Sequence, residues 1–583
     1  MMKSFLLCLV LFCWCGQWAI AQNALPQHQL LKRKTDGLNL RMVRQAAPPK
    51  SEKAVPAYRK AKRKGNAAPE EALPKRVDPL VAPINRWHQY GPPYWNMTPT
   101  IEGEHCPVGC VALAQGQVMH YWKHPAQGEG EHTYNDSTGC GQVLTARFCD
   151  HQYEWNKMRF EYKEGTFTEE EAQPMELLLS DCGISVDMEY RRDASGAASV
   201  MQPISLTSYF GYGREAQIHF RDFYTREEIT EMLKRELAAG RPILISGYNE
   251  RTGHAFVIDG YNEDDWFHVM LGNPDGAGDG WTSLECMNGE HAEYDYTLSP
   301  ESGMNLLQIF ITGIHPKHIP AEGLAETHVY AMGGMTALDT LAGHGDQLAV
   351  CVSNLANVGC NLHTDSVSLM LVQNGNIVCP LYTYDRIFDL EEIEDTAYTD
   401  TLHFTIAPDV EEGDYELRPM FRDEGGVWKA VRCSTGTPNY LLCHIDDNCV
   451  KLSSDTARTA TLTLVDIDIP DLITNGSAPD ISITVKNHNA EATGRIYFLM
   501  EPTVEGRDSF YLYKQGYTLN ADEVRTYRFC EKKIYAPKTG EYRLHILYEN
   551  NLLRDEQMTE LTSEDQPIYV SVLHSSVIQL AKK

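Results

Sequence analysis

The sequence predicts an α+β domain followed by two all-β domains, and three observations indicate this division. Between residues 77 and 316, helix signals are mixed with short apolar runs that suit buried strands. After about residue 320, alternating strands recur, and turn clusters such as "QNGN" and "KTGE" separate many of them. Residues 22–76 are basic and poor in aromatic side chains, which is typical of a segment that cannot form a core.

The first 21 residues are expected to be a secretory signal peptide. Lys3 precedes a short apolar stretch, and "AIA" at residues 19–21 is a small-residue cleavage site. This signal predicts a secreted or cell-surface protein. No later apolar run is long enough to span a bilayer, so no transmembrane segment is expected.

Residues 22–76 carry 14 Lys or Arg against 4 Asp or Glu, whereas the whole chain has a net charge of −29. We interpret this stretch as a pro-segment, held electrostatically on an acidic body and removed at the dibasic Lys75-Arg76. A disordered, solvated linker is the alternative. The acidic balance of the chain argues against a nucleic-acid partner.

Residues 77–318 are expected to form the α+β domain. The segments that begin at Thr168 and Thr225 each carry early acidic residues and end with Gly, which are helix start and stop signals. "RPILISGY" and "HAFVIDGY" are short apolar runs ending in Gly, and we expect both to be buried strands.

Residues 319–455 and 456–583 are expected to form two immunoglobulin-like β-sandwich domains, with a seam near "SSDTARTATLT". The predicted strands include "SVSLMLVQ", "YELRPMFR", "ISITVKN", "RIYFLM" and "EYRLHILYE". No strict internal repeat is found. A surface or adhesion partner is one role for these domains, since sandwich folds by themselves say little about function.

A cysteine stands at the head of a predicted buried helix in "GEHCPVGCVALAQGQVMHYWKHP". The apolar positions after Cys110 recur at spacings of three and four, so they share one helical face: Val111, Ala114, Val118, Met119 and Trp122. The free N–H groups and dipole of a helix N-terminus favour thiolate over thiol, and the thiolate is the nucleophile. The alternatives are a buried structural thiol or a disulfide with Cys106.

A thiolate nucleophile needs a base that takes and returns its proton. The candidate is His254, which follows Gly253 and opens an apolar strand in "ERTGHAFVIDGY". The alternative is a histidine that simply satisfies its hydrogen bonds in the core. The Cys-before-His order agrees with that of papain-like peptidases.

Four segments resemble the streptopain-like cysteine peptidases of the papain-like clan, in family order and over about residues 77–316. "GCVALAQGQVMHYWKHP" is similar to the active-site helix of that family, and "GHAFVIDGY" to its histidine strand. "DCGISVDMEYRRDASGAAS" resembles a wall of the cleft, with Ser195-Gly196 in the matching position. "VDPLVAPINRWHQYGPPYWN" resembles the start of the mature domain.

The resemblance implies a papain-like fold for residues 77–318 and a role for each matched residue. Cys110 would attack the peptide carbonyl, and His254 would carry the proton. Gln89 would complete the oxyanion hole with the Cys110 N–H, although a surface loop residue is the alternative. The resemblance also implies substrate-binding positions at Ser195, Gly196 and Gly253, and neither a metal nor another cofactor.

The chain departs from the family after the histidine strand, where it reads "HVMLGNPDGAGDGW". Met270 stands where the family has the Asn that orients the histidine, and Leu271 stands where it has Trp. A methionine cannot orient an imidazole by hydrogen bonding. Asn273 could take this part if the loop bends differently. The alternative is an unoriented, slower or inactive dyad. "DGAGDG" is expected to be a mobile cleft loop without a metal.

These observations predict a secreted cysteine endopeptidase, made as a zymogen, that hydrolyses peptide bonds in proteins through a Cys-His dyad. The alternative is a catalytically degenerate scaffold that acts as a secreted binding or adhesion protein. Acyl transfer to amines would use the same dyad and is a third reading.

Overall fold

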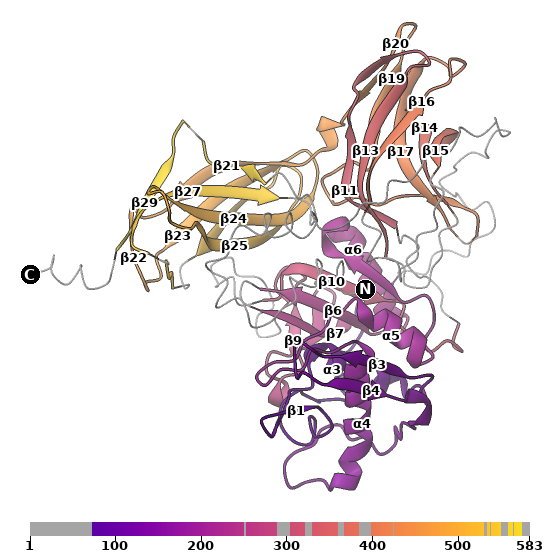
Figure 1. Cartoon of the computed structure of the whole chain (residues 1–583), viewed down its shortest axis with the longest axis vertical. Coiled ribbons are helices and arrows are strands. Elements are labelled where there is room, and N and C mark those ends of the chain that lie inside the picture. The colour runs from indigo at the N-terminus through magenta and orange to yellow at the C-terminus, as the bar shows by residue number, and fades with distance from the viewer. Residues whose placement is uncertain are drawn as a thin grey trace, which may run out of the picture.

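The computed structural model describes residues 73–249, 252–287, 303–320, 329–358, 366–383, 398–423, 425–529, 533–536, 538–549, 558–563 and 565–573. The predicted signal peptide and all but the last four residues of the predicted pro-segment lie outside these ranges. Three bodies follow one another along the chain in Figure 1: a mixed α/β body and then two bodies of strands. No helix in the described ranges has the length and hydropathy needed to span a membrane.

The helices of the first body are α3 (Cys110–Trp122), α4 (Glu169–Ser185), α5 (Met201–Tyr209) and α6 (Arg226–Ala238). Helices α4 and α6 begin at the predicted threonines, Thr168 and Thr225, and each of these closes a reciprocal capping box with the Glu three residues later. The predicted end of α4 at Gly183 is wrong, because the helix continues to Ser185. Gly183 instead lets another chain segment approach closely, since a Cβ there would lie 2.0 Å from the Tyr190 hydroxyl.

One antiparallel sheet supports these helices. Its strand order is β5 (Gln217–Phe220), β10 (Leu306–Thr312), β6 (Ile243–Tyr248), β7 (Gly253–Tyr261), β8 (Phe267–Met270) and β9 (Gly280–Thr282). Two short hairpins, β1 (Thr100–Ile101) with β2 (Glu104–His105) and β3 (His132–Asn135) with β4 (Val143–Ala146), complete the body. The predicted strands "RPILISGY" and "HAFVIDGY" are confirmed as the neighbours β6 and β7.

Helix α3 is buried between α4 and strand β7. Burial covers the predicted apolar positions at its start and centre and also extends to the polar side chains of Gln115 and Gln117. The Gln115 amide donates to the Ser205 hydroxyl at 2.9 Å, and the Gln117 amide donates to the Trp87 carbonyl at 3.3 Å. These hydrogen bonds offset the free-energy cost of burying the two amide groups. Polar side chains can therefore occupy a helix that is buried on several sides.

The first β domain consists of two antiparallel sheets around one apolar core. One sheet has the order β11 (Val329–Ala337), β13 (Gln347–Asn357) and β16 (Tyr398–Thr405). The other has the order β12 (Leu341–Gly343), β20 (Cys449–Ser453), β19 (Leu441–Ile445), β17 (Gly413–Arg422), β14 (Ser366–Gln373) and β15 (Asn376–Thr383), and β18 (Trp428–Ala430) pairs with β17. The predicted strand "SVSLMLVQ" is confirmed as β14.

The second β domain has a similar strand order, but its larger sheet has one strand fewer along its path and a parallel pair of strands at one edge. Its smaller sheet is β21 (Thr461–Asp468), β23 (Ile481–His488) and β26 (Val524–Phe529). Its larger sheet is β22 (Leu472–Thr474), β29 (Ile568–Leu573), β27 (Gly540–Glu549), β24 (Ala492–Pro502) and β25 (Phe510–Leu519), and β28 (Thr559–Glu560) pairs with β27. The smaller sheets of the two domains each join three strands in the same order, whereas the larger sheets differ at the edge. The immunoglobulin-like character of both domains and the boundaries at residues 318 and 455 stay predictions.

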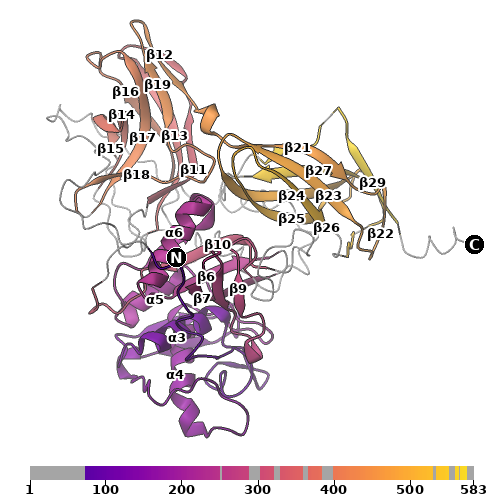
Figure 2. The same cartoon turned by 180° about the vertical axis from the view of Figure 1, so that it is seen from behind.

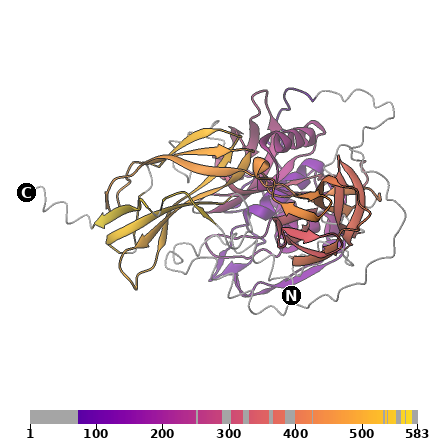
Figure 3. The same cartoon turned by 90° about the horizontal axis from the view of Figure 1, so that it is seen from above.

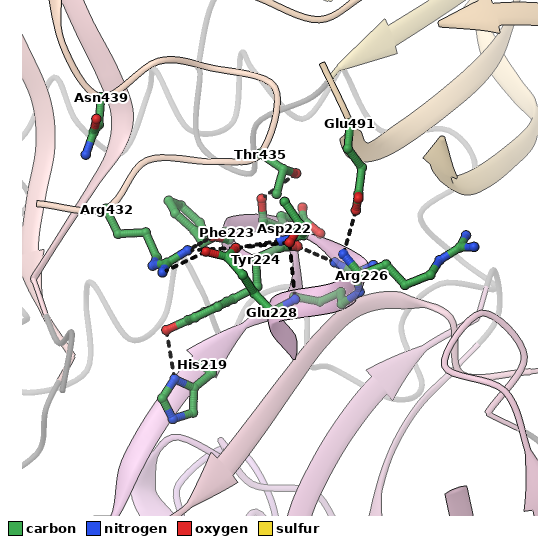
Figure 4. Close-up of polar contacts among 12 residues, drawn as sticks. His219, Asp222, Phe223, Tyr224, Arg226, Glu228, Arg432, Thr435, Asn439 and Glu491 are labelled. Atoms are coloured by element: carbon green, nitrogen blue, oxygen red, sulfur yellow. Dashed lines mark hydrogen bonds and ion pairs between the residues drawn. The ribbon is translucent and has the colours of Figure 1, made fainter. Parts of the chain in front are cut away.

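One corner of the first body accepts hydrogen bonds from the first β domain (Figure 4). This corner is the short turn η3 (Arg221–Phe223), which follows strand β5. The Thr435 N–H and hydroxyl both donate to the Asp222 carbonyl, at 2.8 and 3.0 Å. The Arg432 guanidinium donates to the Phe223 carbonyl at 2.8 Å. Main-chain carbonyls of the corner therefore accept hydrogen bonds from a loop of the first β domain.

The second β domain reaches the same corner. Its Arg495 pairs with the Asp222 carboxylate at 3.1 Å and with Glu549 of its own domain at 2.5 Å. The carboxylate of Glu491 accepts a hydrogen bond from the Arg226 N–H at the start of α6, at 2.6 Å (Figure 4). The turn η3 and the first turn of α6 are therefore shared by all three bodies.

The figures agree on how the bodies are arranged. Both β domains adjoin the end of the first body that carries α6 and β10, and α4 lies at the opposite end (Figures 1 and 2). Viewed from above, the second β domain extends away from the first body to one side (Figure 3).

Candidate active site

Cys110 is the first residue of α3, as the sequence predicts. The preceding Gly109 has φ of +90°, and a Cβ there would lie 2.6 Å from the Met188 side chain and 3.3 Å from the Ser195 carbonyl. Glycine is therefore required both by the backbone conformation and by the space. Cys106 and Cys110 carry free thiols, so the alternative of a disulfide between them is not found.

The Cys110 sulfur lies among backbone hydrogen-bond donors. Hydrogen bonds from the backbone of Ala255, Val111 and Cys110 itself lower the pKa of the thiol, as predicted for a helix start. Burial has the larger, opposite effect, and the net result is a raised pKa. The helix terminus acts in the predicted direction, but desolvation of the Cys110 thiol outweighs it, so the net direction favours the thiol.

His254 is the second residue of β7, directly before the Ala255 that bonds to the Cys110 sulfur. Its Nε2 donates to the Leu271 carbonyl at 2.6 Å. A carbonyl can only accept, so the neutral ring carries its proton on Nε2, and Nδ1 is the basic nitrogen. Burial lowers the pKa of His254, while the Leu271 carbonyl and the charge of Asp279 raise it. These directions favour the neutral form of the imidazole and the neutral form of the thiol.

The ring of His254 is oriented by a main-chain group and not by the predicted Asn273. The Asn273 amide donates to the Ala277 carbonyl at 2.9 Å, within its own turn η4 (Pro274–Gly276). Met270 is 2% exposed and belongs to the apolar core, so it offers the histidine no polar group. The expectation for Asn273 is thus replaced by the carbonyl of Leu271, the residue after the methionine.

Gln89 lies beside the segment that leads into α3. Its carbonyl accepts a hydrogen bond from the Val108 N–H at 3.1 Å, and its side chain is buried. The bond from Gln117 of α3 to the Trp87 carbonyl fixes the same stretch two residues earlier. The alternative of an exposed loop residue is therefore not found. The position suits an oxyanion-hole donor, a role that stays a prediction.

Two of the three predicted substrate-binding residues adjoin the candidate pair, since Ser195 lies against Gly109, which precedes Cys110, and Gly253 precedes His254. Ser195 is buried, its carbonyl faces Gly109, and its hydroxyl lies among the buried side-chain atoms without a hydrogen-bond partner. Gly196 forms a backbone bridge with Glu189, at 2.8 and 3.1 Å. Gly253 precedes the histidine, and the ring of Tyr248 packs against it so closely that a Cβ would lie 2.3 Å away.

Two contributors to this site were not found by sequence reasoning. One is the Leu271 carbonyl, which no residue type reveals because every residue has one. The other is Asp279, which belongs to the "DGAGDG" stretch and accepts a hydrogen bond from the Leu271 N–H at 2.7 Å. In the described ranges no group of three or more His, Cys, Asp or Glu is arranged to hold a metal ion.

Comparison with known proteins agrees with these features. Residues 87–281 match the model of the Peptidase C10 family. The chain is 29% identical over 278 residues to the thiol protease/hemagglutinin PrtT of Porphyromonas gingivalis, a match that covers 46% of this chain and 31% of that protein. It is 30% identical over 244 residues to streptopain of Streptococcus pyogenes, which covers 39% of this chain and 60% of that protein.

The chain therefore spans less than two thirds of the length of these curated relatives. Among solved structures, the interpain A cysteine protease of Prevotella intermedia aligns with 42% of this chain and 96% of that chain, at 29% identity and a TM-score of 0.38. The resemblance to streptopain-like cysteine peptidases that the motifs predict is confirmed by the family match.

Proposed function

Because residues 87–281 carry a domain of the Peptidase C10 family, we propose that the chain is a secreted cysteine endopeptidase that cleaves proteins. One observation supports this most directly. His254 is held by the Leu271 carbonyl, and the next residue, Ala255, donates its N–H to the Cys110 sulfur. This arrangement supports the proposal of a nucleophile, a nearby base and a group that orients the base.

The proposed reaction begins from the neutral pair. His254 Nδ1 takes the thiol proton as the Cys110 sulfur attacks the peptide carbonyl, and a tetrahedral oxyanion forms. The Cys110 N–H and the Gln89 amide donate to this oxyanion, and loss of one such donor typically costs about 10²–10³-fold in rate. The imidazolium then protonates the leaving amine, and water, deprotonated by His254, hydrolyses the acyl-enzyme.

We also propose that the chain is a zymogen cut after Arg76. Lys75 and Arg76 are exposed, so a processing peptidase could reach the dibasic pair. The Val77 N–H already donates to the Tyr261 carbonyl of β7 at 2.8 Å, and the Tyr261 hydroxyl donates to the Pro74 carbonyl at 2.5 Å. The new N-terminus would therefore form on a segment that is bonded to the strand carrying His254.

The test is casein cleavage by the chain without its first 21 residues, with and without a thiol reductant. Cys110→Ala should abolish cleavage, and Cys149→Ala, which removes another partly exposed thiol, should retain it. N-terminal sequencing should find Val77 as the first residue of the active form. Cleavage that persists in Cys110→Ala would refute the proposal.

The degenerate scaffold is the second candidate, and the replacement of the family Asn by Met270 favours it. A folded wild-type chain that fails both to cleave casein and to react at Cys110 with iodoacetamide would support this candidate, and the β domains would then be tested for adhesion. Acyl transfer would be recognised by mass spectrometry, as products that carry an added amine in place of water.

A further inference from the structure

Both main-chain polar groups of Leu271 form hydrogen bonds: its C=O bonds to the candidate base, and its N–H bonds to a carboxylate. Its C=O accepts the hydrogen bond from His254 Nε2 at 2.6 Å, and its N–H donates to Asp279 Oδ1 at 2.7 Å. These two groups belong to successive peptide units. The arrangement can therefore fix the position of the carbonyl, but it does not conduct a proton to the histidine.

We propose that Asp279 is a positioning residue that holds the Leu271 carbonyl where it orients His254. This inference rests on the proposed function, and Asp279 replaces in effect the Asn that the chain lacks at Met270. The orienting group is a main-chain carbonyl, so its position depends on the backbone at Leu271. The hydrogen bond from the Leu271 N–H to the Asp279 carboxylate holds that backbone in place.

The backbone around Leu271 requires close approach. Gly272 has φ of +67°, and a Cβ there would lie 2.4 Å from the Leu113 side chain of α3. Gly278 has φ of +84°, and a Cβ there would lie 2.6 Å from Leu271 Cδ1. These glycines let the loop fold against α3 and return to its own start.

Asp279 is fixed at the end of this loop. Its N–H donates to the Gly276 carbonyl at 3.0 Å, and strand β9 begins at the next residue, Gly280, which pairs with Val269 of β8. The carboxylate therefore belongs to the residue directly before the sheet. Through Asp279, the position of the Leu271 carbonyl is tied to the start of β9 and not only to the loop between β8 and β9.

The electrostatic surroundings couple Asp279 to His254. Burial raises the pKa of Asp279 to about 6, and Asp259 of β7 adds to this rise. The Leu271 N–H, His268 of β8 and Arg86 lower it. The charge of Asp279 in turn raises the pKa of His254. As the pH falls through about 6, protonation of Asp279 removes this charge. The acidic limb of the pH–rate profile is thus expected to report two groups and not one.

The experiment uses two substitutions and one matched control in the chain without its first 21 residues. Asp279→Asn keeps an oxygen that can accept from the Leu271 N–H but removes the charge. Asp279→Ala removes the acceptor as well. The control is Asp275→Asn, because Asp275 is an exposed carboxylate in the same loop whose φ of +58° suits asparagine.

Asp279→Ala is expected to lower kcat by about 10–100-fold, with KM changed by less than about threefold, because misplacement of a reacting group costs rate more than affinity. Asp279→Asn should lose less in kcat and should flatten the acidic limb of the profile to a single ionisation. The control should match the wild type in both respects.

A second readout does not need peptidase activity. The pKa of His254, followed by NMR of ¹³C-labelled histidine, should fall in Asp279→Asn relative to Asp275→Asn. If the wild type cleaves casein and Asp279→Asn matches the control in rate, profile and histidine titration, the positioning role is overturned. If the wild type does not cleave but the titration shifts, the proposed function fails and the positioning role stands.

Discussion

Arg495→Met is expected to destabilise the attachment of the second β domain more than any exposed charge substitution does. The Arg495 side chain is 7% exposed, and it lies between Asp222, which is 5% exposed, and Glu549. Methionine has a similar length and fills irregular space well, so the main change is the loss of the cation. Two carboxylates then face each other without their partner.

The size of the effect follows from burial. Removing one member of a buried ion pair costs about 3–5 kcal/mol, because the remaining charge stays desolvated and unpaired. The Arg528–Asp480 pair in the same domain is the matched control, since its side chains are 51% and 55% exposed. Breaking an exposed pair by Arg528→Met should cost less than about 1 kcal/mol.

Urea unfolding and calorimetry are the assays. Arg495→Met should unfold the second β domain in a separate, earlier transition, whereas Arg528→Met should follow the wild type. Adding Asp222→Asn to Arg495→Met should recover part of the loss, because one of the unpaired charges is removed. The reasoning would be refuted if Arg495→Met cost no more than Arg528→Met.

Two further substitutions, His120→Gln and Met270→Asn, test the first body. The side chains of His120 and His219 are buried, and burial lowers their pKa values to about 4 and about 3. Below pH of about 6.5 the unfolded chain binds protons that the folded chain excludes, so each histidine should reduce stability by about 1.4 kcal/mol per pH unit as the pH falls. When the free energy of urea unfolding is measured between pH 7.5 and 5, His120→Gln should lose less stability per pH unit than the wild type. An unchanged pH dependence would contradict the lowered pKa of His120. Met270→Asn, which restores the family residue, should not raise kcat and should cost about 1–3 kcal/mol, because it buries an amide in the core while the Leu271 carbonyl already holds His254. A gain in casein cleavage would show instead that the carbonyl is an inadequate substitute.

Several elements were predictable because their signals are local. The capping threonines Thr168 and Thr225 each need only a glutamate three residues later, so the starts of α4 and α6 could be predicted from short segments. The start of α3 at Cys110 follows from Gly109 and the apolar spacing. Strand β14 is confirmed at both ends because turn residues follow a strongly apolar run.

The remaining features depend on contacts between distant residues. The local sequence predicts that a helix ends at Gly183. In the structure the helix continues past it, and the missing side chain makes room for the Tyr190 hydroxyl. The net direction of the Cys110 pKa depends on desolvation, which no single segment determines. The roles of main-chain carbonyls could not be predicted from residue types either. The Leu271 carbonyl orients His254, and the Asp222 carbonyl accepts a hydrogen bond from the Thr435 N–H.

The place where the β domains attach determines how the molecule would bear mechanical load. Load on either β domain reaches the first body through the contacts at η3 and the start of α6, directly after the edge strand β5, and through the chain that leaves β10. Strands β10 and β6 separate this edge from β7, which carries His254. Tension from a tethered β domain would therefore strain the rim of the sheet before it disturbed the distance between sulfur and imidazole.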